Sequence, residues 1–150
     1  MIDMSTLTVA MYDLLNENSA LDILGCTTER STTINADPGR CPWIGIYPDA
    51  VDSEPRTAVA KSWMNHAGLQ IVIQASSLAD SGTAASDELE ELIAAVLDVI
   101  NDDLPLSGAG TGIRITRIRR EYSYVLFDSE GTGDLFMPQA VIKVSLEARS

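Results

Sequence analysis

Residues 87–101 read DELEELIAAVLDVIN, and this stretch decides the class of fold. Its large apolar side chains recur at intervals of three and four residues, which is the period of one helical face. They are Leu89, Leu92, Ile93, Val96, Leu97 and Ile100. Acidic side chains crowd the first turn, where they favour the helix dipole, and Ser86 or Asp87 is expected to cap it. The pattern predicts one long helix with a continuous apolar stripe.

Strands are predicted on both sides of this helix. Pro105 and the glycines that follow it end the helix, and strands are then expected at 113–119, 121–127 and 135–148. Before the helix, residues 69–75 alternate between apolar side chains and glutamines, which is typical of a strand with one buried face. An earlier strand is expected at 43–47, because a proline stands at each end of it.

The sequence pattern in the N-terminal part of the chain predicts a further helix and then a loop. Leucine, alanine and methionine share one helical face over residues 6–17, and Ser5 or Thr6 is the expected cap. A short apolar turn follows this helix. Residues 26–42 are polar and predict a loop, with a short extended piece around 32–35.

Together these segments predict a single α+β domain over residues 1–150. Its expected core is a mixed or antiparallel β-sheet packed against the long helix, with the N-terminal helix beside it. Residues 49–68 carry several acids, a proline and then the sequence Trp-Met-Asn-His at 63–66. We interpret this segment as an extended arm or hairpin extension on the surface.

The composition is that of an ordinary folded protein, with 45% hydrophobic and 21% charged residues. No apolar run is long enough to span a bilayer, and the first residues lack the features of a signal peptide, so a cytoplasmic place of synthesis and assembly is expected. Cys26 and Cys41 form no CxxC pair, and we interpret them as small, partly buried thiols.

The charge is strongly negative and unevenly distributed. The net charge of −12 opposes ordinary binding of nucleic acid through a basic face. Four of the ten basic residues nevertheless fall in one segment, at Arg114, Arg117, Arg119 and Arg120. Strand alternation need not place all four on one face. Three roles stay open: contact with the acidic surface of a neighbouring subunit, solvated charges that protect an edge strand, and transient contact with passing DNA.

Side chains that could carry catalysis or bind a metal are few. The only histidine, His66, lacks an accompanying serine or cysteine motif, so a solvated or partner-facing imidazole is the expected role. The glycines at 108–112 follow a helix instead of preceding one, which is the wrong order for a phosphate site. Asp128, Glu130 and Asp134 predict a solvated hairpin turn in preference to a calcium site. We therefore expect no catalytic residue, cofactor or metal.

The sequence resembles the tail-terminator (tail-completion) proteins of tailed bacteriophages, which belong to the head–tail joining proteins. The resemblance covers nearly the whole chain and consists of apolar patterns and element order. The similar segments are Leu14-Leu15, NSALDILG at 18–25, PWIGIYP at 42–48, the strand at 69–73, the helix at 89–100 and the closing strands at 113–127 and 136–147. Residues 49–68 depart from the pattern and have no residue-by-residue counterpart.

This resemblance implies a structural protein of the virion, assembled in the cytoplasm of the bacterial host. The family forms a ring, usually a hexamer, at the head-proximal end of the tail. The ring stops polymerisation of the tail tube and offers an attachment surface to the head. The implied partners are other copies of the chain, the major tail-tube protein, a head-completion or neck protein, and the sheath of a contractile tail. DNA would pass through the ring without specific binding.

Interface residues are then expected in three places: the arm, the turn between the last two strands, and the arginine segment. They are Trp63, Met64, His66, Asp128, Glu130, Asp134, Arg114, Arg117, Arg119 and Arg120. Trp63 is the expected anchor, because buried aromatic side chains dominate interface energies, and its alternative is a core tryptophan. Two other functions stay open for the chain. One is a head–tail adaptor or neck subunit on the portal side, and the other is a small cytoplasmic enzyme or ligand-binding domain.

Overall fold

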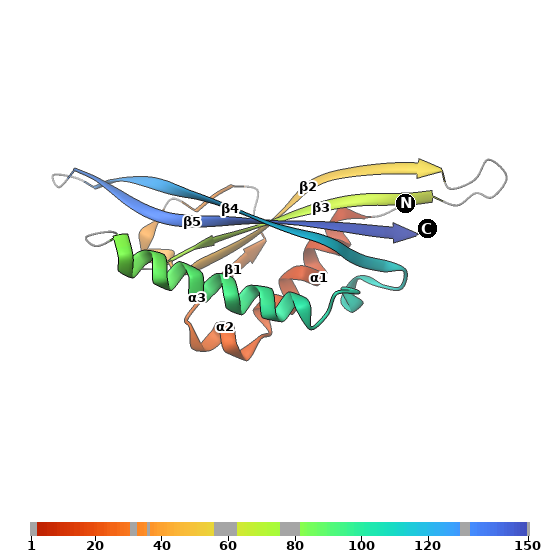
Figure 1. The fold of residues 1–150 in the computed structure, drawn as a ribbon, viewed down its shortest axis with the longest axis horizontal. Helices are drawn as coiled ribbons and strands as arrows, with labels where there is room; N and C mark the ends of the chain where they lie inside the picture. The colour runs from red at the N-terminus through yellow and green to blue at the C-terminus, as the bar shows by residue number, and fades with distance from the viewer. Residues whose placement is uncertain are drawn as a thin grey trace.

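The described residues of the computed structural model form a five-stranded sheet with helices on one side (Figure 1). These residues are 3–30, 33–35, 37–55, 63–75, 82–129 and 133–149. The strands, in their order across the sheet, are β1 (Thr27–Arg30), β2 (Trp43–Pro55), β3 (Trp63–Gln74), β5 (Gly133–Arg149) and β4 (Ile113–Ser129). β1 runs parallel to β2, and the other neighbouring pairs are antiparallel. The predicted α+β class is confirmed, and the sheet is mixed.

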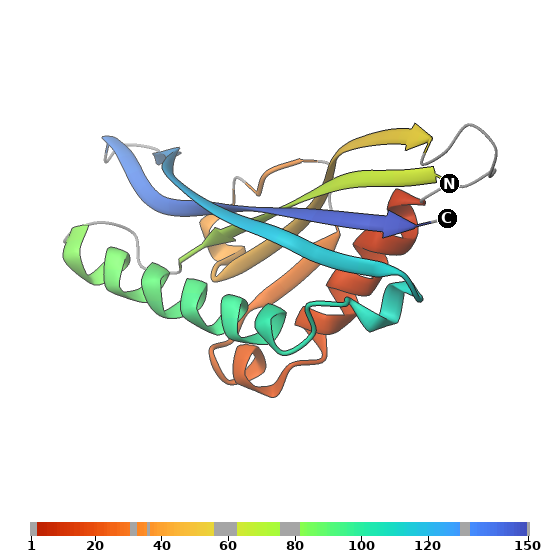
Figure 2. The same ribbon diagram turned by 45° about the vertical axis from the view of Figure 1, so that its right-hand side comes forward.

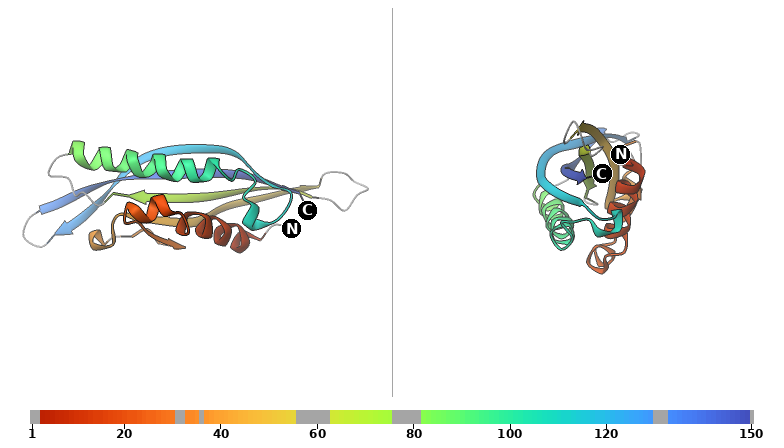
Figure 3. Two further views of the ribbon diagram at one scale, coloured as in Figure 1. Left: turned by 90° about the horizontal axis from the view of Figure 1, so that it is seen from below. Right: turned by 90° about the vertical axis from the view of Figure 1, so that its right-hand side faces the viewer.

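The helices cover the same face of the sheet, as Figure 3 shows from below and from one end. They are α1 (Met4–Asn16), α2 (Ser19–Ile23) and α3 (Gly82–Asn101), and short 3₁₀ turns occur at Pro38–Arg40 and Ser107–Ala109. The predicted cap of α1 is wrong, because Asp3 accepts the hydrogen bond from the Ser5 N–H at 3.0 Å. The predicted cap of α3 is also wrong. This helix begins at Gly82, since the alanines before Ser86 favour a helix.

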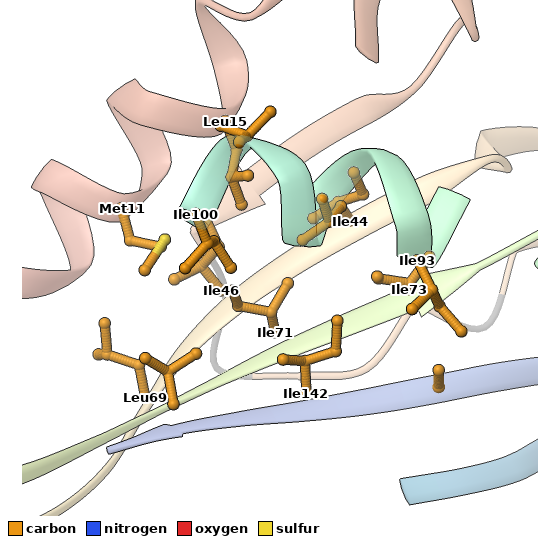
Figure 4. Packing of buried hydrophobic residues seen from close by; sticks show 14 of the residues in the cluster. Met11, Leu15, Ile44, Ile46, Leu69, Ile71, Ile73, Ile93, Ile100 and Ile142 are labelled. Atoms are coloured by element: carbon orange, nitrogen blue, oxygen red, sulfur yellow. The ribbon is translucent and has the colours of Figure 1, made fainter. Parts of the chain in front are cut away.

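The hydrophobic core lies between the helices and the sheet (Figure 4). The large side chains labelled in the figure are each at most 1% exposed: Met11, Leu15, Ile44, Ile46, Leu69, Ile71, Ile73, Ile93, Ile100 and Ile142. Each such burial stabilises the fold by roughly 1.5–3 kcal/mol. The predicted stripe of α3 is confirmed except at Leu97, which is only half-buried, while Val99 is buried instead.

β4 is one continuous strand of 17 residues, so the prediction of separate strands at 113–119 and 121–127 is wrong. β5 pairs with it from Ile113 to Ser129, and no break occurs at Arg120. The irregularity lies earlier, where the register shifts between Ile115 and Arg117. A shift of this kind is a β-bulge, which adds a residue to one strand without ending the ladder.

β1 was not predicted, and the extended piece expected around 32–35 is not a strand at its described residues 33–35. The strand lies earlier, at Thr27–Arg30, and pairs with the start of β2. The Thr27 N–H donates a hydrogen bond to the Pro42 carbonyl at 2.9 Å. Two threonines, a glutamate and an arginine show no apolar alternation, so the sequence pattern gave no sign of this strand.

The described residues of the predicted arm, 49–55 and 63–68, form the outer part of the β2–β3 hairpin, and the rest of the segment lies outside the described residues. Asn65 and Ala67 are 0% and 4% exposed, which corrects the expectation that this whole segment lies on the surface. Both residues lie on the side of β3 that the helices cover, in line with Leu69 and Ile71. Figure 2 shows this hairpin at the end of the molecule where both termini lie, and the β4–β5 hairpin at the other end.

Candidate functional site

The face of the sheet that carries no helix, called here the open face, gathers most of the predicted arginines. The β5 residues Ile142, Val144 and Leu146 are buried under the helices, so the residues between them point to the open face. Across the ladder, Arg114 pairs with Glu147, Arg117 with Ser145 and Arg119 with Lys143. The bulge between Ile115 and Arg117 is what brings Arg114 to the same face as the other two.

We call Arg114, Arg117, Arg119 and Lys143 the basic row. Glu121 and Glu147 are the acids beside it on β4 and β5. Arg119 lies 3.4 Å and Lys143 3.5 Å from Glu121, and Arg114 lies 3.7 Å from Glu147. The Arg114 and Arg119 side chains are 72% and 61% exposed, so water screens these pairs, and each stabilises the fold by at most about 1 kcal/mol. Among the described residues, Arg117 forms no ion pair.

Arg120 is separated from the basic row, because alternation turns it to the helix side of β4. There its charge acts on Tyr122 of β4, which also interacts with Glu90 of α3. A hydrogen bond with Glu90 is the main reason that the pKa of Tyr122 is raised above its usual range, and the positive charge of Arg120 acts in the opposite direction. Tyr122 is 56% exposed, so this cluster lies at the surface where β4 passes the helix.

The other predicted interface residues lie at the two ends of the sheet. His66 is exposed and pairs with Asp52 on one side and Glu147 on the other, so it shares a row on the open face with Arg114. The backbones of Trp63 and Met64 pair with Pro55 and Glu54, and their side chains lie outside the described part.

In the other hairpin, Asp128 pairs with Asp134 through the backbone, and their side chains and the whole of Glu130 lie outside the described part. The structure thus brings His66 and three arginines to one face, whereas the end of β4 and the start of β5 lie at the far end of the sheet (Figure 1).

The β2 side of the open face is covered by the loop that precedes β2, and Trp43 is buried beneath it at 1% exposure. The Trp43 ring lies over Gly45, where a Cβ atom would be 2.7 Å from Cζ3 and 2.8 Å from Cζ2. Its Nε1–H donates to Glu29 at 3.2 Å, and Glu29 also pairs with Arg40 of the loop. The core tryptophan of the described residues is therefore Trp43, a role that sequence reasoning did not assign to it.

Sequence reasoning also missed a ladder of buried amides that crosses the open face. The Asn35 side chain donates to Gln74 Oε1 at 3.0 Å, and Gln74 Nε2 donates to Gln139 Oε1 at 3.2 Å. Gln139 Nε2 then donates to the Ser123 hydroxyl at 3.0 Å. The glutamine alternation in β3 is the signal that could have indicated it. The ladder fixes the loop and strands β3, β5 and β4 in one register.

Both cysteines are half-buried, as predicted, and their thiols resist ionisation. Burial is the main reason that the pKa of each is raised to about 11, and the negative charge of Glu88 adds to the effect at both. A thiol with this pKa is almost entirely protonated at neutral pH and is a poor nucleophile.

Within the part of the chain that the structure describes, no group of three or more histidine, cysteine, aspartate or glutamate side chains is placed to hold a metal ion. None of the helices in that part combines the length and the apolar character needed to cross a membrane.

Comparison with known proteins identifies no family. No family model and no curated protein matches the sequence. One similar solved structure is of a protein whose name describes no activity. The similarity covers 99% of this chain and 96% of that one, at 15% sequence identity and a TM-score of 0.49.

Proposed function

We propose that this chain is a structural subunit of a tailed-phage virion, which forms a ring at the head-proximal end of the tail. In this role it ends polymerisation of the tail tube and presents a surface to the head or neck. The sequence resemblance is the reason for proposing this position in the virion. The open face and the two hairpins supply the surfaces through which one copy could hold its neighbours.

The observation that carries the proposal is that strands β4 and β5 are longer than a compact domain of this size. β4 and β5 have 17 residues each, which is about 55 Å of extended chain. A compact domain of 150 residues is only about 38 Å across, from the usual dependence of the radius of gyration on length. The β4–β5 hairpin projects at one end and the β2–β3 hairpin at the other (Figures 1 and 2). Strands longer than folding requires favour a role in contacts between molecules.

Two projecting ends suit a subunit that joins unlike structures. A ring subunit must contact its copies sideways, the tail tube below and the neck above. Hairpins at opposite ends would let one copy reach both of these partners, with Trp63 and Met64 in one hairpin and Asp128, Glu130 and Asp134 in the other. DNA would pass through the ring, and the net charge of −12 on each subunit would oppose binding of the DNA.

The test is negative-stain electron microscopy of the purified protein, alone and with tail tubes assembled from the major tail-tube protein of the same phage. Rings of the protein, together with caps on one end of tubes that stop growing, are the expected result. Tubes that keep growing uncapped while the protein decorates portal-bearing heads would establish the neck adaptor instead. Binding to neither tubes nor heads would overturn a structural role at the head–tail junction.

A further inference from the structure

The outer side of the helices and the β4 half of the open face carry opposite charge. Helices α1, α2 and α3 contain no lysine or arginine. Exposed carboxylates recur along the outer side of α3 and its end at intervals of four and seven residues, which places them on one face. They are Asp87, Glu91, Asp98 and Asp102, called here the acidic stripe. The basic row lies on the other side of the sheet. One copy therefore exposes both halves of a complementary pair of surfaces.

The charges of the basic row are available to a partner. Glu121 is shared between Arg119 and Lys143 across distances of 3.4 and 3.5 Å, so neither base is closely neutralised. Arg117 forms no ion pair with the described residues. With four bases and two acids, this half of the open face has an excess of positive charge in a protein of net charge −12. An exposed concentration of the minority charge favours a negatively charged partner.

The two surfaces also match in length. From Arg119 to Arg114 the ladder advances from Lys143 to Glu147 on β5, which is about 13 Å. From Asp87 to Asp98 an α-helix rises about 16 Å. Three arginines on a stiff edge strand can therefore face three carboxylates on a stiff helix without rearrangement of either. Guanidinium groups suit this contact, since each can hold a carboxylate with two hydrogen bonds.

We infer that the basic row of one copy docks on the acidic stripe of a second copy. The inference rests on the proposed function, because it names the contact between neighbouring subunits of the ring. The two surfaces differ and lie on opposite sides of the sheet, so the contact joins copies head to tail. A head-to-tail contact leaves one free surface of each kind on every pair and can close into a ring. The second copy is favoured over DNA because its acidic stripe matches the basic row in length and presents its carboxylates on a stiff helix.

The test uses two charge-reversed proteins. One carries Arg117→Glu and Arg119→Glu, and the other carries Glu91→Arg and Asp98→Arg. Self-association is measured by sedimentation velocity at low ionic strength, where surface charges are least screened. The wild type is expected to associate, and each variant alone is expected to raise the dissociation constant at least tenfold. An equimolar mixture should associate through contacts between the two different variants, because each such contact again joins opposite charges.

The matched control is Arg120→Glu compared with Arg117→Glu. Both reverse one exposed arginine on β4, but Arg120 lies on the helix side of the strand. The Arg120→Glu protein should keep the wild-type dissociation constant within about threefold, whereas Arg117→Glu should weaken association by roughly tenfold. Circular dichroism and thermal unfolding verify that each variant is folded. An equal effect of the two substitutions would show that total charge, and not this contact, governs association.

Several outcomes overturn the inference. They are a wild type that stays monomeric at low ionic strength, a mixture of two folded variants that does not associate, and double-stranded DNA that binds the wild type but not Arg117→Glu while self-association is unchanged. Failure of the proposed function is seen separately. Restored association in the mixture without any capping of tail tubes would retain this contact and reject the terminator role. Capping of tail tubes by each variant alone would retain the terminator role and reject this contact.

Discussion

Gly45 lies beneath the Trp43 ring, and its replacement by alanine is expected to destabilise the fold. A Cβ atom at this position would be 2.7 Å from Cζ3 and 2.8 Å from Cζ2, and nearer still to Cη2. Carbon atoms in contact need about 3.5–4.0 Å, so Gly45→Ala must move the ring by roughly 1 Å. The ring is 1% exposed and its Nε1–H is held by Glu29 at 3.2 Å, so it has no free direction in which to move.

The expected cost follows from two terms. Overpacking of a tight interior costs about 1–3 kcal/mol. Loss of a hydrogen bond to a charged acceptor costs a further 1.5–3 kcal/mol or so, reduced here because Glu29 is partly exposed. Alanine also restricts the unfolded chain, which offsets about 0.4–1 kcal/mol. We therefore expect Gly45→Ala to lower the free energy of unfolding by about 3 kcal/mol and Tm by roughly 6–12 °C.

Gly68→Ala is the matched control, since it makes the same substitution on the same face one strand away. A Cβ atom there would meet Asp49 Cβ at 3.2 Å. Asp49 is exposed and lies at the register shift between Pro48 and Val51, so it can yield by a few tenths of an ångström. Its cost should stay below about 1 kcal/mol. Guanidinium titration followed by tryptophan fluorescence and circular dichroism measures both variants. Similar stability losses in the two proteins, or none in Gly45→Ala, would refute the packing argument.

Three further predictions can be checked with the same unfolding measurements. Gln74→Leu leaves the amides of Asn35 and Gln139 without their shared partner and should cost about 2–4 kcal/mol, which urea titration would detect. The raised pKa values of Cys26 and Cys41, from 9.0 to about 11, mean that the unfolded chain loses these protons first. Stability should therefore fall as pH rises from 9 to 11, and replacing both by alanine should flatten that part of the Tm profile. Trp63→Ala should weaken ring formation, seen by sedimentation, and leave cooperative unfolding intact, whereas loss of cooperativity would identify Trp63 as a core residue.

The elements that sequence alone could predict are those whose burial is one-sided and regular. In α3, Leu92, Ile93 and Val96 repeat at helical spacing because one stripe faces the sheet, and the structure confirms that stripe. In the first half of β3, the buried Leu69 and Ile71 alternate with the partly exposed Gly68 and Gln70, because only one face there meets the helices. In both cases the hydrophobic period is set directly by the geometry of the element. The antiparallel pairing of β4 with β5 follows from the short connection between them.

What could not be predicted depends on contacts between distant segments. β1 has no apolar pattern, and it exists because β2 offers it an edge. Trp43 is buried on the open face because the loop before it folds back, with Asn35 reaching Gln74 across 39 positions in sequence. Local propensity contains no information about such a loop. The Gln74 and Gln139 side chains, which alternation assigns to solvent, are consequently buried and satisfied by one another.

The face on which each arginine lies depends on the isoleucines around it, and strict strand alternation does not predict it. Strict alternation puts Arg114 and Arg117 on opposite faces, which made a single basic surface uncertain from the sequence. Isoleucines stand at 113, 115 and 118, however, and a strand that turns all three toward the helices needs one extra residue after Ile115.

Turning Ile115 and Ile118 inward buries two large apolar side chains, at 6% and partial exposure, and this gain exceeds the cost of one unpaired residue in the ladder. The bulge therefore follows from hydrophobic burial. The alignment of Arg114 with Arg117 and Arg119 follows from the bulge. When the isoleucines face the helices, these arginines face the open side of the sheet. A protein with Thr116 deleted would alternate strictly from Ile113 to Arg119, so its isoleucines would still face the helices and its arginines would still share the open face without a bulge. Retention of cooperative unfolding and of self-association in that protein is the outcome this reasoning requires, and loss of both would contradict it.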